Sequence, residues 1–149
     1  MDMKTTKVRV WDKEQKKFLE IGSEEEQATP QYSGKDGLFF TLNGYVDENG
    51  YAYEIDAKIV QQTGLKDKDD TDIYEGDIFE ENYFDNEHEG QVIKRYEVIF
   101  NNGAFMAKPI GVKSSKFPLY LVFMFANKER SNDMKVLGNV FENPELLEN

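Results

Sequence analysis

Short apolar runs separated by glycine and asparagine turn signals most constrain how this 149-residue chain can fold. No stretch of ten or more residues repeats apolar side chains with the 3.6-residue period of an amphipathic helix. Many short strands joined by Gly/Asn turns are typical of a small barrel or roll. We therefore predict a mainly-β protein that contains at most short helical turns.

The clearest local signals lie in the second half of the chain. Asn101-Asn102-Gly103 predicts a tight hairpin turn, since Asn and Gly tolerate positive φ. The apolar run 119–126 predicts a fully buried strand, and Asn143-Pro144-Glu145 predicts the start of a short helix. We expect loops at 22–37, with at most a helical turn, and at 82–90, a long acidic segment.

The first half gives weaker signals. Trp11 is expected to anchor the first strand in the core, and Asn43-Gly44 and Asn49-Gly50 are expected to form turns. The pattern changes near residues 57–62. We therefore expect an N-terminal β-rich segment at 1–60 and a β-roll at 61–149, which could also form one continuous domain.

Composition excludes several chemistries and suggests a compartment. The chain has no cysteine and one histidine, so disulfides, thiolate catalysis and Cys/His zinc sites are excluded. Residues 1–10 contain no signal-peptide core, and the longest apolar run is far too short to cross a bilayer. We predict a cytoplasmic protein without a cofactor or a membrane partner.

The acidic charge is concentrated in one window. The formal net charge is −11, and within residues 67–89 eleven acids against one base, Lys68, leave −10. His88 lies in this window, and we expect it to be exposed. A run of charge is usually a solvated surface. We therefore expect a solvated contact surface for a protein partner, made by Asp67, Asp69, Asp70, Asp72, Glu75, Asp77, Glu80 and Glu81.

Three other interpretations of the same window stay open. Oxygen ligands suit Ca²⁺ or Mg²⁺, but an EF-hand loop starting at Asp67 would have Asp72 in place of glycine and Ile78 in place of glutamate. Glu75 and Asp77 could share acid and base roles if a strand placed them on one face. The acids could also mimic nucleic-acid phosphates and bind a basic protein.

Direct nucleic-acid binding is a further alternative, although the net charge disfavours it. Small barrels often present aromatic side chains on which bases stack, beside a basic groove. The candidate residues are Lys94, Arg95, Lys108, Lys113 and Lys116 with Tyr96, Phe105 and Phe117.

Four stretches in this order resemble a known family. They are Arg9-Val10-Trp11-Asp12, the segment 62–68 (QTGLKDK), the segment 73–78 (IYEGDI) and the segment 137–147 (LGNVFENPELL). The chain resembles the YopX family of bacteriophage and prophage proteins from about residue 7 to 147. Where many members have Asn-Gly after the Lys-Asp-Lys, this chain has Asp69-Asp70, and we expect the same turn, somewhat strained.

The resemblance implies a phage origin and an SH3-like β-barrel or roll in the C-terminal part, and it implies no activity. Together with the absence of a catalytic constellation, it predicts a noncatalytic accessory protein that binds a protein partner in the host cytoplasm. A metal-assisted enzyme using Glu75 and Asp77, or an acidic nucleic-acid mimic, is the alternative. The oligomeric state, including a homo-oligomer, is left open.

Overall fold

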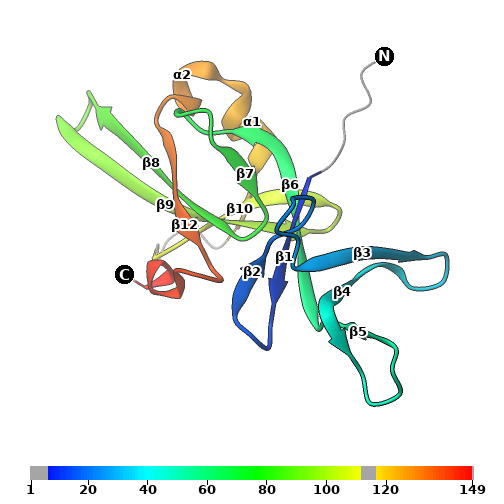
Figure 1. The fold of residues 1–149 in the computed structure, drawn as a ribbon. Helices are drawn as coiled ribbons and strands as arrows, with labels where there is room; N and C mark the ends of the chain where they lie inside the picture. Colours follow the sequence, from blue (N-terminus) through cyan, green and yellow to red (C-terminus); the bar gives the residue numbers. More distant parts are fainter. Residues whose placement is uncertain (1–6, 112–116, 149) are drawn as a thin grey trace. The chain divides into compact units, whose positions relative to one another are not determined.

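A computed structural model describes residues 7–111 and 117–148 and divides the chain into two compact units. The N-terminal unit is Lys7–Val60, and the C-terminal unit starts at Gln61. Strands dominate both units, so the prediction of a mainly-β protein is confirmed (Figure 1). None of the helices in the described ranges is long and apolar enough to cross a lipid bilayer.

The N-terminal unit consists of two sets of hairpins. Strands β1 and β2 pair with Trp11 opposite Phe18, and a second sheet has the order β3-β4-β5. Its buried core is Val10, Leu19, Ala28, Phe40 and Ile55. The strands are β1 (Val8–Asp12), β2 (Lys17–Leu19), β3 (Ala28–Ser33), β4 (Gly37–Val46) and β5 (Ala52–Glu54), and β6 (Ala57–Lys66) begins in this unit.

The C-terminal unit is built on a five-stranded antiparallel sheet with the order β11-β10-β9-β8-β12. The sheet curls like half a barrel around its core (Figure 1). The strands of this unit are β7 (Asp72–Tyr74), which pairs with β6 outside the five-stranded sheet, then β8 (Asp77–Asp85), β9 (Gly90–Asn101), β10 (Ala104–Pro109), β11 (Leu119–Tyr120) and β12 (Met134–Asn139). The helices are α1 (Leu121–Ala126), α2 (Lys128–Ser131) and the 3-10 helix η1 (Pro144–Leu147).

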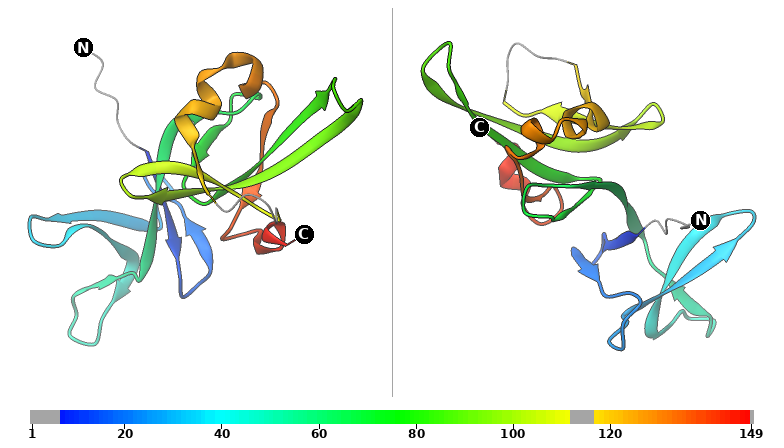
Figure 2. Two further views of the ribbon diagram at one scale, coloured as in Figure 1. Left: turned by 180° about the vertical axis from the view of Figure 1, so that it is seen from behind. Right: turned by 90° about the horizontal axis from the view of Figure 1, so that it is seen from above.

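The core of this unit lies between the sheet and α1. Its buried members are Ile73, Phe79, Tyr96, Val98, Ala107, Leu121, Met124 and Met134. The pairing of β8 with β12 ends at Glu81, and that of β9 with β10 ends at Tyr96. Beyond these points β8 and β9 continue as a two-stranded arm, which Figure 2 shows projecting from the sheet.

Several turn predictions are confirmed. Asn101 pairs with Ala104, so Asn102 and Gly103 form a two-residue turn, with φ of 52° and 80°. These angles fit the twist of the flanking strands. Asn49-Gly50 joins β4 to β5, and Pro144 starts η1. Asn43-Gly44, in contrast, lies inside β4, where the pairing with β5 shifts register and forms a bulge.

Two segments predicted as loops form strands. Residues 28–33 form β3, because the ladder with β4 satisfies their backbone groups. The predicted acidic loop at 82–90 is mostly strand, since β8 runs to Asp85 and β9 starts at Gly90. Both pairings depend on a partner strand, which local composition does not reveal.

The predictions for Trp11 and for residues 119–126 were also wrong. Trp11 is half-buried against the edge of Phe18, and its neighbour Val10 enters the core. Only Leu119 and Tyr120 are strand, and the rest of the apolar run forms α1. Leu121 and Met124, three residues apart, are the buried residues of this helix. An apolar run of this length does not distinguish a strand from a helix.

Candidate functional site

Three of the eight acidic residues predicted to form a contact surface are buried, namely Asp67, Asp77 and Glu81. A buried carboxylate is costly unless hydrogen bonds or a cation compensate it. Each of the three has such compensation, so each stabilises a particular part of the C-terminal unit.

Asp67 holds the turn between β6 and β7. One oxygen, Oδ1, accepts hydrogen bonds from the amides of Asp69 (2.8 Å) and Thr71 (2.9 Å). The other, Oδ2, accepts from the amide of Val136 in β12 at 2.9 Å. Asp70 has a φ of 66°, so the strained turn expected at Asp69-Asp70 is present. Asp67 therefore joins a local turn to a strand 69 residues further along the chain.

Asp77 closes the turn between β7 and β8. Its Oδ2 accepts a hydrogen bond from the amide of Tyr74 at 2.8 Å. Gly76 has a φ of 86°, donates to the carbonyl of Val98 at 2.7 Å and accepts from the amide of Val140 at 2.8 Å. Glu75 lies in the turn and Asp77 is buried, so the pair considered for acid–base catalysis does not share an exposed strand face.

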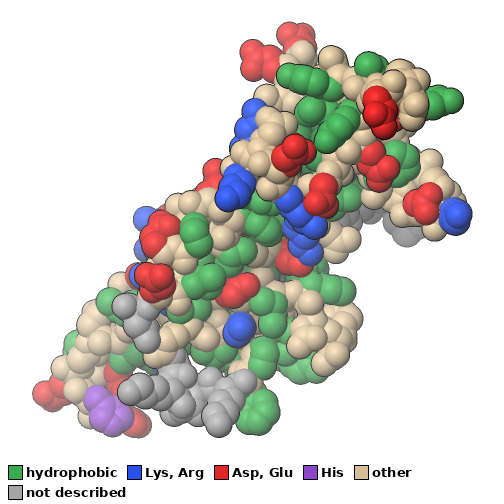
Figure 3. All heavy atoms as spheres, turned by 90° about the horizontal axis from the view of Figure 1, so that it is seen from below, with side chains coloured by type: hydrophobic (Ala, Val, Ile, Leu, Met, Phe, Trp, Pro, Cys, Tyr) green, Lys and Arg blue, Asp and Glu red, His purple; other side chains and the backbone are tan. Residues whose placement is uncertain are grey.

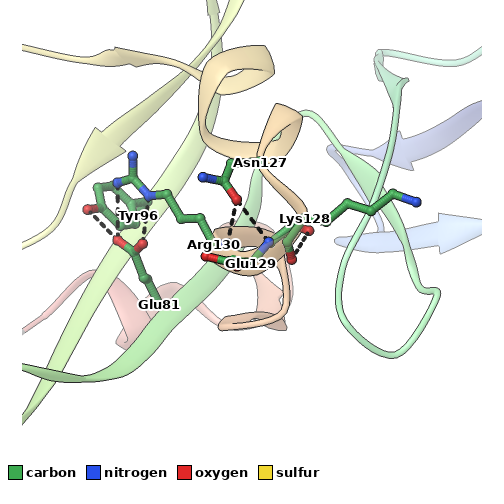
Figure 4. A network of polar contacts seen from close by, with 7 residues as sticks. Glu81, Tyr96, Asn127, Lys128, Glu129 and Arg130 are labelled. Carbon is green, nitrogen blue, oxygen red and sulfur yellow. Dashed lines mark hydrogen bonds and ion pairs between the residues drawn. The ribbon is translucent and has the colours of Figure 1, made fainter.

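Glu81 is buried and forms an ion pair with the partly exposed Arg130, where the arm leaves the sheet (Figure 4). The guanidinium donates to Glu81 Oε2 from Nε (2.8 Å) and to Oε1 from Nη2 (3.3 Å), and the hydroxyl of Tyr96 also donates to Oε1. Burial, and then the charge of Glu81, raise the pKa of Tyr96 to about 12. The hydrogen bond to Glu81 raises the pKa of Arg130.

A polar hollow of about 330 Å³ lies beside this ion pair. It is lined by Glu81, Tyr83, Lys94, Asn127, Glu129, Arg130 and Asp133. Its two cations have partners, since Arg130 binds Glu81 and the ammonium of Lys94 lies over the Tyr83 ring at 5.8 Å. The side chain of Asn127 accepts from the amides of Glu129 and Arg130 and caps α2. These three lining side chains therefore have partners within the protein.

Three of the other predicted acids, Asp70, Asp72 and Glu80, have basic neighbours. Lys66 lies 3.7 Å from Asp70 and 3.5 Å from Asp72. Glu80 pairs across the sheet with Arg95 and with Lys135. Among the described residues, no three Asp, Glu or His side chains gather as metal ligands would. On the face drawn in Figure 3, acidic and basic side chains are interspersed.

At the tip of the arm, His88 is exposed, as predicted. Its Nδ1 lies 2.7 Å from Asp85 Oδ2, and this hydrogen bond lowers the pKa of Asp85.

An exposed apolar surface on β11 and α1 was missed by the sequence prediction. We call Leu119, Tyr120, Val122 and Phe123 the apolar patch. Val122 is 56% exposed and Phe123 is 72% exposed, whereas Leu121 and Met124 are buried. The rings of Tyr120 and Phe123 pack edge to face at 5.7 Å. Large apolar surfaces that stay in contact with water mark interaction sites.

Comparison with known proteins identifies the family. A family model described as YopX protein matches residues 7–148. The chain belongs to the YopX family. Among solved structures it is similar to the crystal structure of protein EF1440 from Enterococcus faecalis, with 24% identity, a TM-score of 0.55, and coverage of 97% of this chain and 99% of that chain. This likeness shows a shared fold. No curated protein matches.

Each of the stretches that resemble the YopX family contains a side chain that accepts backbone hydrogen bonds in a turn. Asp12 of the first stretch accepts from the amides of Glu14 (2.9 Å) and Gln15 (3.1 Å) in the β1–β2 turn. Asn139 of the last stretch accepts from the amides of Phe141 and Glu142. In the two central stretches, the carboxylates of Asp67 and Asp77 likewise accept hydrogen bonds from backbone amides. The motifs that identify this YopX-family chain therefore stabilise its fold.

The structure separates the residues considered for nucleic-acid binding. Tyr96 is buried and Phe105 is partly buried in the core, whereas Phe117 is exposed. Lys108 lies opposite Glu97 across β9 and β10, and burial raises the pKa of that carboxyl group. Lys113 and Lys116 lie outside the described residues. The described part of this set does not form an aromatic stacking surface.

Proposed function

We propose that this YopX-family protein is a noncatalytic binding module that uses its apolar patch to recruit a protein partner in the cytoplasm of a phage host. The observation that carries the proposal is the exposure of Tyr120, Val122 and Phe123 on either side of the buried Leu121. Burying such side chains against a partner supplies about 25 cal/mol for each Å² removed from water. The host setting is supported by the sequence resemblance to phage and prophage proteins.

The position of the patch also suits a binding role. Leu121 and Met124 anchor α1 in the core, so Val122 and Phe123 between them point away from the core on a fixed backbone. Rigid aromatic side chains lose little conformational entropy on binding, which makes them frequent energetic centres of interfaces.

The test compares Phe123→Ser with Phe84→Ser, which makes the same change at an exposed Phe outside the patch. The tagged full-length variants are used to capture proteins from phage-infected host cells, after circular dichroism shows equal folding. We expect a partner that the wild type and Phe84→Ser enrich and that Phe123→Ser binds about 30-fold more weakly.

Two outcomes would contradict the proposal. Equal capture by Phe123→Ser and Phe84→Ser would show that the patch does not contact the partner. Light scattering that shows a homodimer dissociated by Phe123→Ser alone would assign the patch to a second copy of the chain.

A further inference from the structure

A groove of about 500 Å³ opens in the N-terminal unit, on the side of β4 that faces β5. Thr41 of β4 pairs with Glu54 of β5, and the amide of Ile55 donates to the carbonyl of Phe40 at 2.9 Å. After this bond the chain leaves β4 and continues into β6. Within the described part of this unit, no strand pairs with residues 37–39 of β4 on this side.

The backbone of β4 at Leu38 faces the groove. The carbonyl of Phe40 points to Ile55, and backbone groups two residues apart in a strand point to the same side. Pro30 of β3, which has no N–H, lies opposite Phe40, so this pair makes no ladder bond on the β3 side. Tyr32 and Leu38 form the next pair two residues along, so by the alternation of an antiparallel ladder they also exchange no backbone hydrogen bonds with each other. The N–H and C=O of Leu38 therefore point into the groove, as at an open sheet edge.

The side chains around this edge combine apolar and acidic chemistry. The floor is apolar, and the rim carries three carboxylates from Asp36, Glu54 and Asp56. Lys13 contacts Asp56 at 3.4 Å, but it is not part of the lining. Residues 7–60 contain seven basic and eleven acidic residues, which gives a net charge of −4. The apolar lining residues are Leu38, Phe39, Phe40, Ile55, Ala57 and Ile59.

We propose that this groove binds an extended segment of a partner protein in which apolar and basic residues alternate. The segment adds a strand to the free edge of β4 and exchanges backbone hydrogen bonds with Leu38. Alternation along a strand sends its apolar side chains to the floor, while Lys or Arg side chains reach the rim carboxylates. This surface and the apolar patch belong to different units, so the inference does not depend on the proposed function.

The test measures fluorescence anisotropy of a labelled ten-residue peptide that alternates Lys and Val, titrated with the full chain. The triple variant Asp36→Asn, Glu54→Gln, Asp56→Asn removes the rim charge. Its matched control, Glu20→Gln, Glu24→Gln, Glu25→Gln, makes the same change in net charge at exposed positions outside the groove. We expect the groove variant to weaken binding about tenfold or more and the control to change it less than about twofold.

The peptide itself provides the test of strand addition. Methylation of alternate backbone amides removes the donors that would pair with β4, and we expect binding to be lost in one of the two registers of methylation. Equal binding of the groove variant and the control, equal binding of a Glu/Val peptide, or no effect of methylation in either register would overturn the proposal. A wild-type dimer that the groove variant alone dissociates would assign the groove to a second copy and would also overturn it.

Discussion

Both units consist mainly of short strands, but the C-terminal unit buries more polar and charged side chains than the N-terminal unit. The C-terminal unit has four buried polar side chains that accept hydrogen bonds from the amides of turns or from a distant guanidinium: Asp67, Asp77, Glu81 and Asn139. In the N-terminal unit, Asp12 is the buried carboxylate, and it acts within its own hairpin. Buried hydrogen-bonded groups tolerate few alternatives, so the unit with more of them carries more of the family's motifs.

The residues that stabilise the turns and the residues proposed to bind a partner also lie at different positions in the chain. The C-terminal unit places its motifs inside turns, and its exposed apolar residues on β11 and α1 lie outside them. The N-terminal unit has the smaller core, an open strand edge and a groove. The two proposed binding surfaces therefore lie outside the family's turn motifs.

The largest expected effect tests whether each core stabilises its own unit. Phe79→Ala removes a ring that stacks on Tyr96 at 5.2 Å and packs on the edge of Phe125 at 5.5 Å. We expect it to lower the free energy of unfolding by about 3–5 kcal/mol. The matched change Phe40→Ala removes a buried Phe from the smaller core. Urea denaturation combined with amide hydrogen exchange measures both.

We expect Phe79→Ala to speed exchange in β8 and β9, and Phe40→Ala to speed exchange in β3 and β4. If either variant accelerated exchange equally in both units, the two cores would form one cooperative structure and the comparison would fail.

The second prediction measures how much the packing of Phe141 against Gly76, in the turn between β7 and β8, restricts the residue at this position. Gly76 and Gly50 have nearly the same φ, 86° and 83°, so alanine meets similar backbone strain at both positions. A Cβ at Gly76 would lie 2.6 Å from Phe141 Cε2, whereas a Cβ at Gly50 would have no neighbour within 4 Å. We expect Gly50→Ala to cost about 1–2 kcal/mol and Gly76→Ala to cost about 1–3 kcal/mol more.

Thermal unfolding of both alanine variants measures this difference. Equal losses would mean that Phe141 moves aside without cost, and the close packing of this turn would then not explain its glycine.

The smallest effect concerns alkaline pH. The pKa of Tyr96 is about 12 in the folded protein, against about 10 for an ordinary tyrosine. Between these values the unfolded chain loses a proton that the folded protein keeps, so stability falls as pH rises from about 10 to about 12. We expect Tyr96→Phe to flatten this part of the Tm–pH curve, and the exposed control Tyr45→Phe to leave it unchanged. An unchanged slope in Tyr96→Phe would show that folding does not raise the pKa of Tyr96.

The sequence predicted those parts of the fold that depend on local chemistry. Asn102-Gly103 turns the chain between two strands, and the turn expected at Asp69-Asp70 is present, because Asn, Gly and Asp reach positive φ more readily than most residues. Residues 28–33 and 82–85 were missed as strands, since their pairing depends on partners that only the folded chain supplies.

The charge of the acidic window was determined by the sequence, but its division between surface and interior was decided by tertiary structure. Asp77 and Glu81 are four residues apart in one strand, and their partners are Tyr74, three residues away, and Arg130, 49 residues away. Burial of a carboxylate depends on the donor it meets, and strand alternation or composition does not specify that donor. The exposure of Phe123 and the open edge of β4 likewise follow from which neighbours the fold supplies.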